Sequence, residues 1–381
     1  MASLTCDAPH IISNANAARR TVCSPASLRT FTCSWDVVMV KMQRLVPVVV
    51  LVLVLGGTTA LSQETSRPQH SKPLVLTGAI PLPNVVGRID HLAFDGRGRL
   101  FLSALGNDSE EVIDLSAGAR VRTISGIPRP QGVAYSPEFD KLFVGSDEGK
   151  LYILDGRSLA PLTSIDFGDD VDNLRYDPAT KHVYVGYGDG DAGAIAMVHA
   201  ATNKRLDEEF KLGAHPESFQ LEKVGPHIYV NLPDLKQIAD INRNTGMIVR
   251  WPVTQEGNFP MALDESAHRL FIATRAPARL AVFDTRSGHM VAALPCVLNS
   301  DDLFFDAARK RIYVAGGEGF LSAFQQLDAD HYQLLANVPS AVGARTAGYP
   351  GKGLKGFDQF YLAVPARADH GAEILIYTVQ D

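Results

Sequence analysis

Short apolar segments that alternate with polar loops recur along the chain, and each begins at an aromatic residue. Successive aromatic residues are 42, 41, 45, 42, 42 and 48 positions apart, at Phe101, Phe143, Tyr184, Tyr229, Phe271, Tyr313 and Tyr361. A period near 42 is typical of a four-stranded β-propeller blade, which buries its faces only against its neighbours. The pattern therefore predicts an all-β fold, a seven-bladed β-propeller.

Each repeat shows the same order of four strand-like segments. The first ends at Asp or Ser, as at 91–95, the second carries the aromatic residue, and the third alternates apolar and polar residues, as at 280–284. A hairpin with turn residues such as 284–288 leads to the fourth. Only three such segments follow Val342, and 73–81 resembles the missing fourth one. We therefore expect the N-terminal strand to close the last blade and to remove two exposed edges.

Residues 39–62 have the pattern of a secretory signal peptide. Lys41 and Arg44 precede an apolar stretch at 45–57, and small residues follow at 60–62. That stretch is shorter than the roughly 20 residues that span a bilayer, although an uncleaved anchor is the alternative. We expect a periplasmic or extracellular protein with no stable membrane span after signal cleavage.

The segment at 1–38, upstream of the signal peptide, holds three of the four cysteines and no lasting periodicity. We interpret it as a start codon assigned too early, with a disordered leader as the alternative. Residues 63–72 are expected to form a linker and 73–381 the propeller. Cys296 is then the one cysteine of the exported protein, so packing rather than disulfides must stabilise it.

The charge of the chain narrows the choice of partners. Residues 1–62 carry five Lys/Arg and two Asp/Glu, so removing their +3 changes the formal net charge from −6 to −9. An acidic surface without a Lys/Arg cluster disfavours a nucleic-acid partner. We expect a monomer that binds a small ligand or a protein.

Polar residues share one register in the loops that lead into the seven first strands. The first column of this register, which we name the mouth ring, contains Asp90, Gln131, Asp172, Glu217, Phe259, Asp301 and Arg345. The next column adds the polar residues His91, Asn173 and Asp302. First strands line the channel of a propeller, so these loops surround its mouth. The predicted ligand-binding residues are Asp90, His91, Gln131, Asp172, Asn173, Glu217, Asp301, Asp302 and Arg345.

Crowded carboxylates in this ring require compensation, because like charges raise one another's pKa. Arg345 can neutralise one of them. The remaining acids would suit a divalent cation such as Ca²⁺, which takes about six to eight oxygen ligands; the candidate ligands are Asp90, Asp172, Glu217 and Asp301. A polyol or a cationic ligand would suit them equally. The alternative is architectural: such residues can simply bond backbone amides and channel water.

Other motifs give little support for a particular chemistry. The chain has no Gly-x-Ser-x-Gly turn, no His-Glu-x-x-His helix, no Cys-x-x-Cys-His haem attachment and no nucleotide-binding motif. His215, beside Glu217, is interpreted as structural, since a lone His–Glu pair is no metal motif. Trp251 is the one tryptophan after the signal peptide, which disfavours a quinoprotein dehydrogenase.

The paired residues that open the second strands resemble the YVTN-repeat β-propeller family, the YncE-like exported bacterial proteins. The pairs are Phe143-Val144, Tyr184-Val185, Tyr229-Val230 and Tyr313-Val314. The Thr-Asn half of the motif is replaced, for example by Asn231-Leu232. The resemblance covers about 73–381 and implies a seven-bladed propeller in the periplasm or outside the cell. It implies little about activity.

Two functions follow from these observations. The favoured one is an exported, non-catalytic propeller that binds a small ligand, cation or protein partner at its mouth. The alternative is a lactonase-like hydrolase or isomerase, in which Glu217 or Asp301 acts as general base, His91 as acid, and Arg345 holds an anionic or carbonyl oxygen. This alternative requires Glu217, His91 and Arg345 to converge on one cavity.

Overall fold

The computed structural model describes residues 72–381. The leader expected at 1–38, the signal peptide at 39–62 and, apart from Lys72, the linker at 63–72 lie outside the described residues. Over 72–381, none of the helices is long and apolar enough to cross a bilayer.

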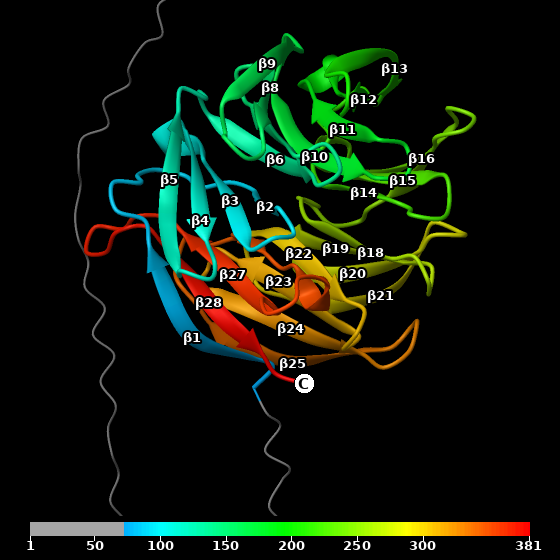
Figure 1. Cartoon of the computed structure of the whole chain (residues 1–381). Helices are drawn as coiled ribbons and strands as arrows, with labels where there is room; N and C mark the ends of the chain where they lie inside the picture. The colour runs from blue at the N-terminus through cyan, green and yellow to red at the C-terminus, as the bar shows by residue number, and fades with distance from the viewer. Residues whose placement is uncertain (1–71) are drawn as a thin grey trace, which may run out of the picture. The chain divides into compact units, whose positions relative to one another are not determined.

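Seven four-stranded antiparallel sheets surround a common centre, which confirms the expected propeller (Figure 1). From the inner strand outward, blade 1 contains β2 (Leu92–Phe94), β3 (Arg99–Ala104), β4 (Ser109–Asp114) and β5 (Ala119–Ser125), and blade 2 contains β6 (Pro130–Ser136), β7 (Lys141–Ser146), β8 (Lys150–Asp155) and β9 (Pro161–Asp166). Blade 3 contains β10 (Val171–Asp177), β11 (His182–Tyr187), β12 (Ala194–His199) and β13 (Lys204–Lys211). Blade 4 contains β14 (Phe219–Leu221), β15 (His227–Leu232), β16 (Gln237–Asn242) and β17 (Ile248–Pro252).

Blades 5 to 7 continue the same order around the ring. Blade 5 contains β18 (Met261–Asp264), β19 (Arg269–Arg275), β20 (Ala278–Asp284) and β21 (His289–Pro295). Blade 6 contains β22 (Ser300–Asp306), β23 (Arg311–Gly316), β24 (Phe320–Gln326) and β25 (Tyr332–Pro339). Blade 7 contains β26 (Thr346–Gly348), β27 (Gln359–Val364), β28 (Glu373–Val379) and β1 (Leu74–Pro81). The helical turns within 72–381 are short 3₁₀ segments: η1 (Leu105–Asn107), η2 (Gly190–Ala192), η3 (Pro233–Leu235) and η4 (Gly351–Gly353).

The N-terminal strand closes the ring as the sequence predicts. β1 pairs antiparallel with β28, with Leu74 opposite Val379 and Pro81 opposite Glu373. In Figure 1 the blue strand β1 lies beside the red strand β28. This pairing completes blade 7 and covers the strand edge that β28 would otherwise expose.

Aromatic side chains fill the spaces between adjacent blades. Phe101, Phe143, Phe271 and Tyr313 are fully buried, and each hydrophobic cluster combines residues of two neighbouring blades, as Phe143 of blade 2 does with Val185 of blade 3. Large rings bury much apolar surface and pack with defined geometry. The repeated aromatic position is therefore a requirement of blade-to-blade packing.

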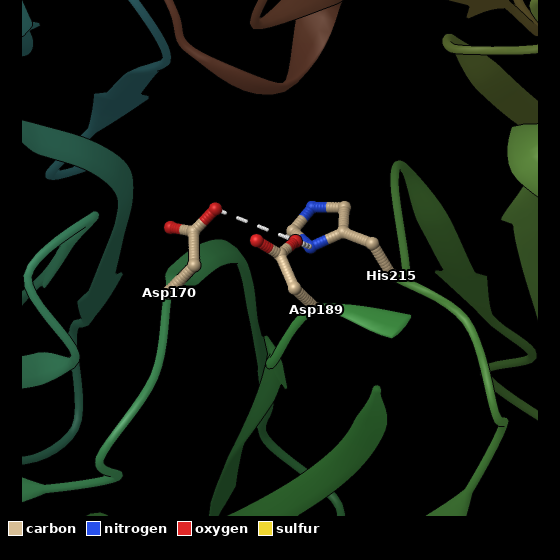
Figure 2. Close-up of side chains that lie close together, drawn as sticks. All are labelled: Asp170, Asp189 and His215. Carbon is tan, nitrogen blue, oxygen red and sulfur yellow. Dashed lines mark ion pairs between the residues drawn. The ribbon is translucent and has the colours of Figure 1, made fainter. Parts of the chain in front are cut away.

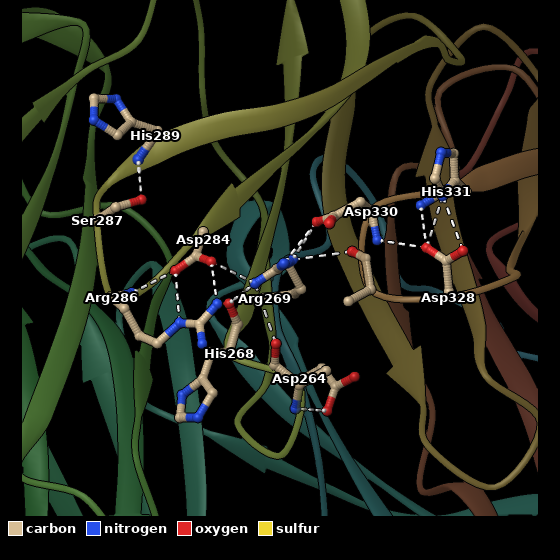
Figure 3. A network of polar contacts seen from close by, with 12 residues as sticks. Asp264, His268, Arg269, Asp284, Arg286, Ser287, His289, Asp328, Asp330 and His331 are labelled. Carbon is tan, nitrogen blue, oxygen red and sulfur yellow. Dashed lines mark hydrogen bonds and ion pairs between the residues drawn. The ribbon is translucent and has the colours of Figure 1, made fainter.

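A buried arginine also connects blades 5 and 6 (Figure 3). The Nη1 atom of Arg269 lies 2.9 Å from Asp284 Oδ2 in its own blade, and Nη2 lies 2.6 Å from Asp330 Oδ1 in the loop before β25. Arg269 Nε donates to the carbonyl oxygen of Ala329 at 3.0 Å. Because this guanidinium is only 5% exposed, its partners satisfy a group that would be costly to bury alone.

Closure of the ring is testable through Leu74, whose buried side chain packs in the cluster with Tyr377 and Val379. We expect Leu74→Ala to lower the free energy of unfolding by about 2–5 kcal/mol, because it leaves a cavity in blade 7. The matched control Leu76→Ala removes a half-exposed side chain from the same strand, and we expect a change below about 0.5 kcal/mol. Denaturant unfolding measures both; equal losses would contradict the closing role of β1.

Candidate functional site at the channel mouth

Irregular strand register directs several mouth-ring side chains toward the channel. The pairing of first and second strands shifts between Pro130 and Val133 in blade 2, and between Val171 and Leu174 in blade 3. Such irregularities re-aim side chains at strand ends. Gly132 also permits close approach of the two blades, because a Cβ atom there would lie 1.6 Å from the carbonyl oxygen of Asp172.

The loops enclose a cavity of about 380 Å³, which we name the mouth cavity. Six mouth-ring residues line it: Gln131, Asp172, Glu217, Phe259, Asp301 and Arg345. Beneath it a floor cavity of about 20 Å³ is lined by Asp90, His91 and Asn173, among others. The structure thus gathers eight of the nine predicted ligand-binding residues around the mouth and its floor. Asp302 faces the opposite side of the floor.

Two of the predicted metal ligands already have cationic partners. Arg88 Nη2 lies 2.7 Å from Asp90 Oδ2. Asp301 lies between two guanidinium groups, with Arg275 Nη2 2.6 Å from Oδ1 and Arg345 Nε 2.8 Å from Oδ2. The mouth is therefore less negative than the ring of acids by itself suggests.

Asp172 lies between two histidines at the centre of the site. Its Oδ1 atom is 3.6 Å from His91 Nε2, and its Oδ2 atom is 3.6 Å from His215 Nε2. The side-chain amide of Asn173 donates to Oδ2 at 3.0 Å. Among residues 72–381, no group donates a hydrogen bond to the buried Oδ1 atom.

The other ring nitrogen of His215 faces the loop that follows β11 and a second pair of acids. Nδ1 lies 3.1 Å from the carbonyl oxygen of Gly188 and 3.2 Å from Asp189 Oδ1. Figure 2 shows the imidazole directed toward Asp170 and Asp189. A proton on Nδ1 satisfies the carbonyl and orients the ring, so Nε2 is presented to Asp172.

Charge coupling shifts the titration of the groups around Asp172. Burial opposes the charged form of His215, but the neighbouring acids, Asp172 foremost, outweigh it and raise its pKa to about 10. Burial likewise opposes the charged form of His91, but its acidic neighbours, Asp172 foremost, outweigh burial and raise its pKa to about 10. Burial also disfavours the Asp172 carboxylate, yet the two imidazolium groups hold its pKa well below the ordinary range.

Burial outweighs the cationic neighbours of the remaining acids, even for Asp90 beside Arg88. Burial, then repulsion from Asp172, raises the pKa of Glu217 to about 8 and that of Asp170 to about 7. Burial foremost raises the pKa of Asp90 and Asp302 to about 6. Within the described part of the chain, no ion pair or side-chain hydrogen bond engages the Glu217 carboxylate.

The acid and imidazole groups form two sets that can hold a metal ion. In the first set, Asp172, His215 and Glu217 each offer one ligand atom, and these atoms lie within 4.8 Å of one another. In the second set, the ligand atoms of Asp170, Asp189 and His215 also lie within 4.8 Å of one another. An Nδ1–H bond to a backbone carbonyl is the usual orientation of a metal-binding histidine. The geometry thus centres the possible metal ligands on His215, which the sequence interpretation left out.

The residues of the hydrolase alternative lie around two cavities. Glu217 and Arg345 line the mouth cavity, whereas His91 lies beneath it and lines the floor cavity with Glu217. Arg345 is also engaged by Asp301 at 2.8 Å. The convergence that this alternative requires is therefore incomplete.

Several functional residues were missed by the two aligned columns. Arg88, Asp170 and His215 all lie two positions before a mouth-ring residue, so a third column of the same register would have found them. Arg275, the last residue of the second strand β19, and Asp189, which follows the second strand β11, also line the cavity. Their position depends on how strands pair, and no repeat signal marks it.

Comparison with known proteins supports the fold. No family model matches the sequence, and no curated protein matches it. One similar solved structure is a chain of the mitotic checkpoint complex, with a TM-score of 0.69 and 12% identity over 87% of this chain and 99% of that chain. Another is the structure of the RRP9 WD40 repeats, with a TM-score of 0.69 and 10% identity over 81% of this chain and 100% of that chain. A chain of Kuenenia stuttgartiensis hydrazine synthase is also similar, with a TM-score of 0.67 and 14% identity over 78% of this chain and 98% of that chain. At these identities the likeness establishes a WD40-like propeller fold.

The protonated His215 makes stability dependent on pH. Its pKa rises from 6.5 to about 10 on folding, so its contribution is complete below pH 6.5 and disappears as the pH rises to 10. We expect the unfolding free energy of the metal-free protein to fall over this window, and to fall less in His215→Gln. The exposed His289→Gln serves as control. Identical pH dependence of all three proteins in denaturant unfolding would contradict the charge assignment.

Proposed function

We propose that this protein is an exported β-propeller of the YVTN-repeat type that binds a divalent cation at its mouth. The propeller fold supports a binding role, since a closed ring presents a preorganised site with little ordering cost. The signal-peptide pattern at 39–62 supports export to the periplasm or the cell exterior.

The observation that carries the proposal is the cluster of Asp172, His215 and Glu217, whose ligand atoms lie within 4.8 Å of one another. Asp172 Oδ1 is buried without a hydrogen-bond donor among the described residues. Two carboxylates and one imidazole suit Zn²⁺ or Mn²⁺ better than Ca²⁺, which prefers oxygen ligands throughout. A bound cation would replace the protons that otherwise compensate these groups, so its affinity should rise with pH.

Hydrolysis is a second candidate, and one observation favours it. Glu217 lines the mouth cavity and its pKa is raised to about 8, which lets one carboxyl group exchange a proton near neutral pH. In this candidate Glu217 is not a ligand of the ion, and a cation held by the second set, Asp170, Asp189 and His215, would polarise a carbonyl group or a water molecule. Turnover of simple lactones by the metal-loaded protein, lost in Glu217→Gln, would support this function.

Cation binding is measurable as stabilisation of the chelator-treated protein. We expect Zn²⁺ or Mn²⁺ to raise the melting temperature in a saturable way, because a ligand at 100 times its Kd stabilises the native state by about 2.7 kcal/mol. Ca²⁺ should give a smaller rise. Asp172→Asn should abolish the ion-dependent rise, since it removes a charged ligand.

Asp207→Asn is the matched control, because Asp207 is exposed on β13 outside the mouth cavity. It should retain the full ion-dependent rise. If none of the three ions stabilises the protein, or if both variants respond like the unaltered chain, the proposal of a cation at Asp172 is wrong.

Export is testable with the full chain expressed in a bacterium. We expect the chain to appear in the periplasmic fraction or the medium with its N-terminus near Gln63, because the small residues at 60–62 suit signal cleavage. Intact mass spectrometry of the fractions measures the cleavage position. Replacing Leu51 and Leu53 by Asp interrupts the apolar stretch and should retain the precursor in the cytoplasm; a cytoplasmic, uncleaved wild-type chain would refute export.

A further inference from the structure

A second and larger cavity occupies the opposite end of the channel. It has a volume of about 600 Å³, and we name it the lower chamber. Small-molecule sites typically measure about 300–1,000 Å³ and are mostly apolar with a few polar groups. The chamber is within this size range, and its lining combines polar groups with five aromatic residues: Tyr135, Tyr176, Phe304, Phe305 and Tyr349.

The tyrosines contribute their rings to the lower chamber, because their hydroxyl groups are engaged elsewhere. Tyr176 donates to Glu138 at 3.2 Å and Tyr349 to Asp306 at 2.7 Å. Neither acceptor belongs to the lining of the chamber. These two tyrosines therefore present their ring faces to the chamber, and polar recognition must come from other lining residues, among them Arg175.

Arg175 on β10 contributes a guanidinium to this lining, and its Cζ atom lies 5.5 Å from the centroid of the Phe219 ring. Its Nη1 donates to the carbonyl oxygen of Leu174 at 2.8 Å and its Nη2 to Ser218 Oγ at 3.5 Å. A guanidinium has five N–H donors, so three remain. Across residues 72–381, no carboxylate lies within ion-pair distance of Arg175, in contrast to Arg275 and its partner Asp301.

Two other charged groups face the lower chamber, His91 and Asp302, and His91 is shared between Asp302 and Asp172. Asp302 Oδ1 lies 3.9 Å from His91 Nδ1, and Asp302 Oδ2 accepts a hydrogen bond from the backbone N–H of Ala347 at 2.7 Å. Asp302 is thus the acid of this end of the channel, and its charge acts on Arg175 without an ion pair between the two among the described residues. The guanidinium of Arg175 therefore keeps N–H groups that an added carboxylate can bind.

We propose that the lower chamber binds an organic anion with an aromatic or apolar body, whose carboxylate pairs with Arg175 while its body contacts the aromatic walls. The planar guanidinium can bind a carboxylate through two parallel N–H···O bonds. Partial burial strengthens this interaction relative to one at the surface. The site is separate from the mouth and does not depend on the proposed cation.

The probe is 2-naphthoate, titrated into the full-length protein by isothermal calorimetry, with neutral 2-naphthamide as the uncharged comparison. We expect saturable 1:1 binding of naphthoate and at least tenfold weaker binding of naphthamide. Arg175→Gln should weaken naphthoate binding at least tenfold, and Arg175→Lys should restore part of it. Arg345→Gln, which removes an arginine from the mouth only, should leave the affinity unchanged.

The comparison of the two probes on the unaltered protein remains decisive even if an Arg175 variant fails to fold. Equal affinity for naphthoate and naphthamide would overturn the proposal, as would naphthoate binding that Arg175→Gln leaves unchanged. Loss of binding in Arg345→Gln but not in Arg175→Gln would assign the anion to the mouth and would also overturn it. Absence of any naphthoate binding would refute an aromatic-anion site.

Discussion

Burial of both faces of every blade is the constraint on which this structure depends. A four-stranded blade exposes apolar side chains on two faces, so each needs a neighbour on either side, and seven blades satisfy this only as a closed ring. The pairing of β1 with β28 closes the ring, because it joins residues 74–81 to residues 373–379. The aromatic residue of each second strand then lies between two blades, as Phe143 and Phe271 do.

Closure also has an electrostatic consequence. It brings the loops before the first strands together around one axis, where Asp90, Asp172 and Asp301 are largely removed from water. Each gains cationic neighbours: Arg88 for the first, His91 and His215 for the second, and two arginines for the third. Glu217 lacks such a partner among the described residues, and with Asp172 and His215 it forms the set for which a cation is proposed.

The two ends of the channel differ in chemistry although the same strands build both. The mouth cavity is lined mostly by charged residues, whereas the lower chamber combines aromatic and apolar side chains with polar groups, Arg175 among them. His91 and Asp302 lie between the two spaces. A rigid ring can therefore present two independent binding environments, one suited to a cation and one to an organic anion.

Periodicity and the exposed edge of an incomplete blade are sufficient to predict the blade number, the four-strand order, the closure by 73–81 and the loops that meet at the mouth. The same register also identified six of the residues that line the mouth cavity. The partners of these residues depend on the folded arrangement of the blades. Arg275 reaches Asp301 from β19, His215 turns toward Asp172, and Arg175 is left without a carboxylate. Register along the chain assigns a residue to a loop, but pairing depends on side-chain direction and on distances across the ring, which the repeat does not encode.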